Sequence, residues 1–161
     1  MVVSSTLDLP TSNLCIIRLS AIGDTCHTIP VIRAIQAAWP DTKLTWIIGK
    51  VEHALLAGLE GVEFVVIDKS RGLRGYFDVR RELRSRRFDL VLHMHASIRA
   101  NLVSLMAPSE IRLGFDRARA RDFQWLFCNE RIPSKPCQHV MDGLFEFATV
   151  LGVERGPLRW D

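Results

Sequence analysis

The chain has 161 residues, a length that fits one domain, and its 48% hydrophobic content indicates a globular core and excludes a disordered tail. Its 21 basic and 18 acidic residues leave a net charge of +3, so the overall charge does not require a nucleic-acid partner. The basic residues are nevertheless concentrated, because eight of them lie in residues 69–87 against only two acidic residues. This local excess predicts an anionic partner.

Apolar strands and amphipathic helices alternate along the chain. In order, we expect a strand at Leu14–Leu19, a helix ending at Ala38 before Pro40, a strand at Leu44–Ile48, a helix at Val51–Leu59, a strand at Phe64–Ile67, a helix at Arg74–Arg87, a strand at Leu90–Met94, a helix at Ser97–Met106, a strand at Ile111–Phe115, a helical turn at Asp122–Phe127 and a helix at Val140–Leu151. On the third of these helices, the spacing places Phe77, Leu83 and the stem of Arg80 inward. Repeated strand–helix units predict an α/β fold, a Rossmann-like parallel sheet with helices on both faces.

The cysteines and the amino terminus bear on the cellular compartment. The four cysteines form no C-x-x-C pair, and Cys15 lies in an expected buried strand, where a reduced thiol acts as a small hydrophobe. The first residues show neither the basic region nor the apolar run of a signal peptide. We therefore expect a cytoplasmic protein, in which any membrane contact would be peripheral.

The turn after the first strand places one acid, Asp24, beside small residues. In an open α/β sheet, ligands bind outside the carboxyl ends of the strands, where a carboxylate can act as a base toward a bound hydroxyl. The alternative is that Asp24 caps the following helix by accepting backbone N–H groups. We expect Ser20 to hydrogen-bond within the turn, and Gly23 to permit a close backbone approach or a positive φ.

Several sequence blocks occur in an order that is typical of one enzyme family. They are Arg18-Leu-Ser-Ala-Ile-Gly-Asp24 with Thr28-Ile-Pro30, Phe88-Asp-Leu-Val-Leu92, Arg112-Leu-Gly-Phe-Asp116, Arg121 and Gln138-His139. From Leu14 to Val153 the chain resembles the amino-terminal half of the ADP-heptose:lipopolysaccharide heptosyltransferases. The resemblance implies a GT-B arrangement, in which two Rossmann-like domains face each other across a cleft. The first domain binds the acceptor and the second binds the nucleotide sugar.

The resemblance also implies how this chain is organised. We expect a flexible amino terminus at residues 1–13, a Rossmann-like acceptor-binding domain at residues 14–153 and the start of an interdomain linker at residues 154–161. The donor, ADP-heptose, would be bound mainly by a second domain that the chain lacks, so we expect the chain alone to be inactive. Neither a cofactor nor a metal is expected. Because the acceptor is embedded in a membrane, the resemblance also implies peripheral contact at the cytoplasmic face of the inner membrane.

The resemblance assigns roles to particular residues. Asp24 matches the general base that takes the proton of the acceptor hydroxyl in an inverting transfer to the lipopolysaccharide inner core. Lys69, Arg71 and Arg74 match basic residues that contact the acidic sugar and phosphates of the acceptor, and Arg121 matches an arginine aimed at it. Guanidinium groups suit these anions because they form charge-assisted, paired hydrogen bonds.

One position departs from the family pattern. Where the family has an acid, a small residue, glutamine and glycine after the fourth strand, this chain has His93-Met94-His95-Ala96. An amide donates and accepts at once, whereas His95 does so in only one tautomer. We include His95 among the acceptor-binding residues, and the departure leaves the identity of the acceptor open.

Three other functions are compatible with parts of the sequence. A non-catalytic module that binds anionic glycans would use the same basic residues. A stand-alone nucleotide-binding Rossmann protein is disfavoured, because no G-x-G-x-x-G follows the first strand. Nucleic-acid binding by the basic segment is disfavoured too, because only Tyr76, Phe77 and Phe88 are available there for base stacking.

Overall fold

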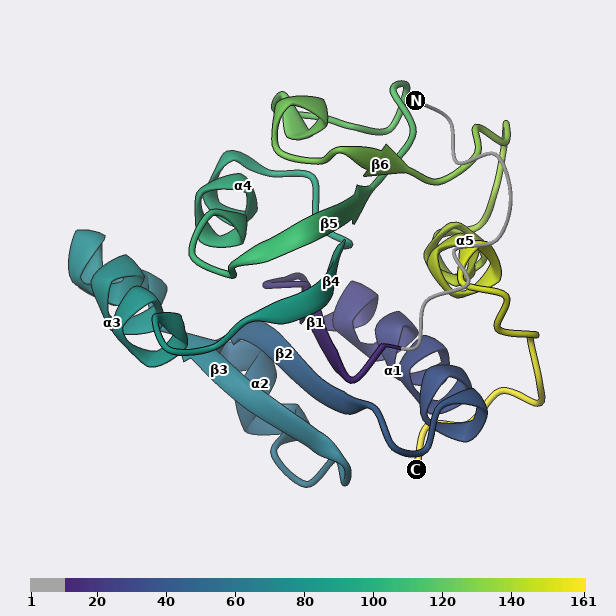
Figure 1. The fold of residues 1–161 in the computed structure, drawn as a ribbon, viewed down its shortest axis with the longest axis horizontal. Helices are drawn as coiled ribbons and strands as arrows, with labels where there is room; N and C mark the ends of the chain where they lie inside the picture. Colours follow the sequence, from purple (N-terminus) through teal and green to yellow (C-terminus); the bar gives the residue numbers. More distant parts are fainter. Residues whose placement is uncertain (1–10) are drawn as a thin grey trace.

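The computed structural model describes residues 11–161, which form a parallel six-stranded sheet covered by helices on both faces (Figure 1). The strands are β1 (Asn13–Ile17), β2 (Lys43–Gly49), β3 (Val62–Ile67), β4 (Phe88–His93), β5 (Ser109–Gly114) and β6 (Glu130–Arg131). Their order in the sheet is β3-β2-β1-β4-β5-β6, and every pairing is parallel. The expected α/β, Rossmann-like fold is confirmed.

The helices divide between the two faces of the sheet. They are α1 (Ile22–Ala38), α2 (Lys50–Leu56), α3 (Leu73–Leu83), α4 (Ile98–Ser104) and α5 (Val140–Val150), with single 3-10 turns η1 (Lys69–Arg71) and η2 (Gln124–Leu126). In Figure 1, α3 and α4 lie on one side of the sheet, and α1 and α5 lie on the other. A hydrophobic core lies on each face of the sheet, and alternate residues of β1 point into one or the other. Leu14 and Ile16 pack beneath α1 and α5, and Cys15 and Ile17 pack beneath α3 and α4.

The inward face of α3 differs from the expected one. The helix ends at Leu83 rather than Arg87, and its buried residues are Gly75, Val79 and Leu83. Phe77, expected to face inward, is 65% exposed, and Arg80 is exposed as well. The cause is Gly75, where a Cβ atom would lie 2.6 Å from the carbonyl oxygen of Asp68. This close approach fixes the rotation of the helix about its axis and turns Phe77 outward.

The ends of the other helices and strands differ from the expected ones by a few residues. The expected turn at Asp122–Phe127 contains η2, whereas η1 and the two-residue β6 were not predicted because both are too short to produce a periodic pattern. Of the expected flexible amino terminus, residues 1–10 lie outside the described residues, and Asn13 already belongs to β1. The linker role of residues 154–161 stays a prediction.

The strand order defines where a ligand would bind. From β1 the chain builds outward to β2 and β3, then crosses to β4 on the other side of β1 and continues to β5 and β6. The sheet therefore has its topological switch point between β1 and β4. In such sheets the crevice that binds ligands lies outside the carboxyl ends of these two strands.

Candidate active site

Arg18 is the buried cation at the carboxyl end of β1. It is 8% exposed, its Nη1 donates to the carbonyl oxygen of Met94 at 2.5 Å, and its Nη2 forms an ion pair with Asp24. Burial lowers the pKa of the Arg18 guanidinium, and the Asp24 carboxylate partly offsets this effect. Arg18 thus connects β1, the end of β4 and the first turn of α1. The sequence analysis assigned it no role, although it is the only charge in that apolar run.

Asp24 lies in the first turn of α1, with its carboxylate partly open to solvent. The N-cap residue is Ala21, which provides no side-chain cap, and Asp24 accepts no hydrogen bond from a backbone N–H of the described residues. Its side chain is 36% exposed, and its Oδ1 has no hydrogen-bond partner within residues 11–161. The capping alternative is therefore wrong. Arg18 holds one carboxylate oxygen, and the other is free to meet a ligand.

Ser20 and Gly23 do not act as the sequence suggested. The Ser20 hydroxyl forms no hydrogen bond with any described residue, so it does not close the turn. Gly23 does not have a positive φ, and a Cβ atom there would meet nothing within 4 Å among the described residues. The expected Ser20 hydrogen bond and the positive φ of Gly23 are wrong, and Gly23 has an ordinary helical backbone because α1 already begins at Ile22. A close backbone approach at Gly23 stays a prediction. The two residues leave a free hydroxyl and an open backbone surface next to Asp24.

His95 follows β4 and contacts the end of β1. Its Nδ1 accepts a hydrogen bond from the backbone N–H of Leu19 at 3.2 Å. A backbone amide is always a donor, so this contact places the ring proton on Nε2. Burial, together with the Arg18 guanidinium, lowers the pKa of His95 to about 3. His95 is therefore a neutral imidazole that offers an N–H donor and, unlike glutamine, no acceptor.

His93, in contrast to His95, is fully buried and contacts only protein groups. Its ring is buried, Nε2 lies 2.9 Å from Oδ1 of Asn101, and the Asn101 amide donates to the carbonyl oxygen of Asp122. Burial lowers the pKa of His93 to about 4. His93 and His95 thus have different partners, and within residues 11–161 no group of three or more His, Cys, Asp or Glu side chains is placed to hold a metal ion.

The two depressed histidine pKa values predict how stability depends on pH. Both rings are neutral in the folded protein, whereas in the unfolded chain they take up a proton below a pH of about 6.5. The free energy of unfolding should therefore fall as the pH drops from about 6.5 toward 4, by up to about 3 kcal/mol from His93. Urea unfolding across this range measures the slope. His93→Gln should reduce this slope, and an unchanged slope in that variant would contradict the neutral, buried state of His93.

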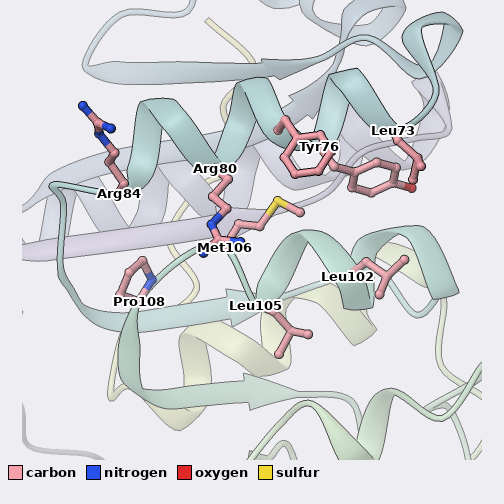
Figure 2. Close-up of a pocket in the computed structure, with 9 residues that line it drawn as sticks. Leu73, Tyr76, Arg80, Arg84, Leu102, Leu105, Met106 and Pro108 are labelled. Atoms are coloured by element: carbon pink, nitrogen blue, oxygen red, sulfur yellow. The ribbon is translucent and has the colours of Figure 1, made fainter.

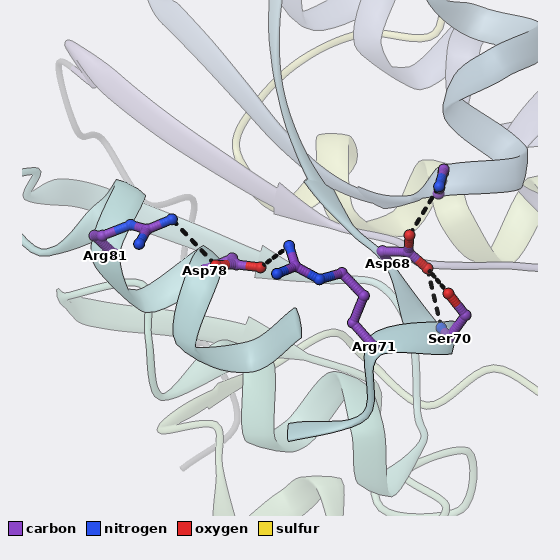
Figure 3. A network of polar contacts seen from close by, with 6 residues as sticks. Asp68, Ser70, Arg71, Asp78 and Arg81 are labelled. Carbon is purple, nitrogen blue, oxygen red and sulfur yellow. Dashed lines mark hydrogen bonds and ion pairs between the residues drawn. The ribbon is translucent and has the colours of Figure 1, made fainter. Parts of the chain in front are cut away.

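Basic residues gather at the carboxyl end of β3, in a network that Figure 3 shows in part. Asp68 caps η1 by accepting from the amide and hydroxyl of Ser70 at 3.0 and 2.6 Å, and it pairs with Lys50 at 2.8 Å. These hydrogen bonds, first that from Lys50, lower the pKa of Asp68 to about 2. Arg71 forms an ion pair with Asp78, which Arg81 also contacts at 3.1 Å. These contacts stabilise the conformation of the segment between β3 and α3.

The three predicted acceptor-binding cations of this segment differ in their partners. Lys69 lies 3.9 Å from Oε1 of Glu52, Arg71 is engaged by Asp78, and Arg74 is exposed and forms no ion pair with a described residue. Glu52 was missed by the sequence analysis, because an acid on a short helix is usually solvated. Its side chain is buried, and its Oε2 has no hydrogen-bond partner in residues 11–161.

Of Arg117, Arg119 and Arg121, which follow β5, only Arg121 has no side-chain partner among residues 11–161. Arg119 pairs with Asp116, and Arg117 lies over the ring of Trp125 at 3.8 Å from its centroid. The side chain of Arg121 is exposed and makes no hydrogen bond or ion pair within the described part of the chain. Arg121 is therefore the cation of this run that remains available to a ligand.

Comparison with known proteins places this geometry in a family. The model of glycosyltransferase family 9 (heptosyltransferase) matches residues 76–161, and the chain is 38% identical over 149 residues to the lipopolysaccharide core heptosyltransferase OpsX of Haemophilus influenzae. The chain belongs to glycosyltransferase family 9. The match with OpsX covers 92% of this chain but 43% of that protein, so the chain spans less than half the length of its family 9 relative.

Solved structures of family 9 show the same fold. The E. coli heptosyltransferase WaaC with ADP superimposes with a TM-score of 0.77 at 24% identity, over 91% of this chain and 49% of that chain. A family 9 glycosyltransferase from Veillonella parvula superimposes with a TM-score of 0.75 at 20% identity, over 89% of this chain and 42% of that chain. The match thus extends over nearly all of this chain and about half of each enzyme.

The residues singled out from the family 9 resemblance fall into three places along one edge of the sheet. Asp24, Ser20, Gly23 and His95 lie at the β1/β4 switch point. Lys69, Arg71 and Arg74 follow β3. Arg121 follows β5. Cations therefore flank Asp24 on both sides.

Proposed function

We propose that this chain is the acceptor-binding half of an enzyme that transfers heptose from ADP-heptose to the lipopolysaccharide inner core. The observation that carries the proposal is the partly solvent-exposed Asp24 carboxylate, which Arg18 holds at the topological switch point of a family 9 domain. The Haemophilus influenzae relative is a lipopolysaccharide core heptosyltransferase, and one structural neighbour is E. coli WaaC with ADP-2-deoxy-2-fluoro heptose. A second domain would bind most of the donor, and the reaction needs no cofactor.

In this proposal Asp24 is the general base of an inverting transfer. The acceptor hydroxyl attacks the anomeric carbon from the face opposite the diphosphate, and Asp24 takes the hydroxyl proton. The new glycosidic bond forms as the bond to the ADP oxygen breaks, and ADP leaves with the electron pair. Arg18 keeps one carboxylate oxygen in place, so the unpartnered Oδ1 is the atom that receives the proton.

The groups around Asp24 suit an acceptor that carries acidic sugars and phosphates. Lys69, Arg71, Arg74 and Arg121 supply positive charge, and His95 supplies a neutral N–H donor to a sugar oxygen. The free Ser20 hydroxyl and the open backbone at Gly23 leave room for the acceptor beside the base. We also place the reaction in the cytoplasm, since the four cysteines are free thiols, as a reducing compartment favours.

Acceptor binding is expected to depend on the cations that follow β3. Replacing Lys69, Arg71 and Arg74 together with glutamine should weaken binding of an acidic inner-core oligosaccharide by at least about tenfold at low salt, and by less at high salt, because salt screens exposed charges. Titration calorimetry at the two ionic strengths measures the effect.

The matched control removes three cations from the opposite edge of the sheet. Lys43 is the first residue of β2, and Arg86 and Arg87 directly precede β4, so their replacement with glutamine changes the net charge equally but leaves the proposed site intact. Equal weakening in both triple variants would show that only net charge matters. Equal affinity of the unaltered chain for single-stranded DNA would count against recognition of a glycan.

A further inference from the structure

An apolar groove runs between α3 and α4, on the face of the sheet opposite α1 and α5 (Figure 2). Its volume is about 640 Å³, and it is lined by Leu73, Tyr76, Phe77, Arg80, Arg84, Leu102, Leu105, Met106 and Pro108. Several of these apolar side chains are exposed, with Leu73 at 75% and Leu105 at 57%. Exposed apolar side chains gathered over two helices indicate a surface that is covered by something else.

The charges at this groove are positive. Arg80 and Arg84 line it, Arg74 lies on the same helix, and none of the three forms an ion pair with a described residue. Of the two acids on α3, Asp78 is already engaged by two other arginines, whereas Glu82 forms no ion pair with a described residue. The groove thus combines an apolar floor with arginines that form no ion pair among the described residues, and this combination favours an anionic partner that also has an apolar part.

We propose that the α3–α4 groove docks the protein on an anionic lipid bilayer. Leu73, Phe77 and Leu105 would enter the boundary between headgroups and acyl chains, while Arg80 and Arg84 contact the lipid phosphates. A second copy of the chain fits the surface poorly, because a twofold contact would bring the arginines of one copy against those of the other. Among residues 11–161, no helix is long and apolar enough to cross a membrane.

The groove is continuous with the segment that follows β3. Leu73, at the start of α3, lines the groove, and it comes two residues after Arg71 and one before Arg74. Docking through this surface would therefore hold the end of β3 close to the bilayer. The inference does not rest on the transfer reaction, since binding to lipid needs neither acceptor nor donor.

Vesicle co-sedimentation of this chain tests the proposal. Vesicles of phosphatidylcholine with phosphatidylglycerol should bind the chain at low salt, and pure phosphatidylcholine should bind it much more weakly. Leu73→Ser with Leu105→Ser, and separately Arg80→Gln with Arg84→Gln, should each lower the partition coefficient by about tenfold or more. High salt should abolish most of the difference between the unaltered chain and the arginine variant.

The matched control uses exposed apolar residues of α2, on the other side of the sheet. Val51→Ser with Leu55→Ser should bind vesicles within about twofold of the unaltered chain. Unchanged far-UV circular dichroism and thermal unfolding would show that all variants fold. Absence of binding to anionic vesicles, or binding that the groove variants retain, overturns the proposal. So does a dimer in sedimentation velocity that dissociates in Leu73→Ser with Leu105→Ser.

Discussion

Asp24→Asn is expected to lower kcat for heptose transfer by at least about 100-fold, while the Kd of the acceptor changes only slightly. An amide cannot take the hydroxyl proton, but its oxygen still accepts from Arg18, so the variant retains the contact that holds the side chain. Asp24→Ala would also remove that contact and leave a buried guanidinium unpaired. The asparagine variant therefore isolates the loss of the base.

The measurement needs a complete donor site. A suitable enzyme is a chimera in which residues 1–161 replace the matching segment of the Haemophilus influenzae relative, assayed for release of ADP. Asp41→Asn, at an exposed acid after α1, is the matched control and should leave kcat unchanged. A kcat for Asp24→Asn within a few-fold of the unaltered chimera would remove Asp24 from the role of base.

Arg18→Met should lower kcat by about 10- to 100-fold and destabilise the fold by about 2 kcal/mol. The substitution keeps most of the aliphatic volume but removes the donors to Met94 and Asp24. The buried carbonyl of Met94 then lacks that partner, and the Asp24 carboxylate can rotate. The expected stability loss stays below that of a fully buried ion pair because Asp24 is partly solvated. Urea unfolding and ADP-release assays measure the two effects.

A double-mutant cycle separates positioning from stability. If Arg18 acts on the reaction by orienting Asp24, Arg18→Met should have little further effect on kcat once Asp24 is asparagine. Arg33→Met is the matched control. Arg33 lies on α1 and donates to Gln36 and to the carbonyl oxygen of Glu60, so this variant also loses a hydrogen-bonded cation, but one that does not contact Asp24. Additive losses of kcat in the double variant would show that Arg18 does not work through Asp24.

The fold could be predicted because its signals are local. Continuous apolar runs separated by helical patterns indicate a parallel sheet, and buried β1 shows such a run from Leu14 to Ile17. The rotation of α3 could not be predicted in the same way. It depends on Gly75 meeting the Asp68 carbonyl, a contact between helix and loop that periodicity does not contain. Phe77 was therefore assigned to the wrong face.

In the candidate site, too, features that depend on the order of elements could be predicted, and features that depend on contacts between distant segments could not. The position of Asp24 beyond the end of β1 follows from the order of elements, so it could be predicted. The burial of Arg18 and the tautomer of His95 depend on contacts between the ends of β1 and β4, and Glu52 is buried at the end of β2 near Lys69. Each of these contacts joins residues far apart in the sequence, so no local sequence pattern predicts them. The hydrogen bond of Ser20 within the turn and the positive φ of Gly23 were wrong predictions, because α1 begins one residue before Gly23.

The bonds that join the end of β1 to the end of β4 also constrain how the molecule assembles. Arg18 with Met94, and Leu19 with His95, each bring together residues 76 positions apart. Contacts of such long sequence separation form only after the intervening chain has been ordered, which slows folding. During synthesis, the amino-terminal βα units can emerge and pack, but the candidate site at the ends of β1 and β4 stays incomplete until β4 leaves the ribosome and inserts beside β1.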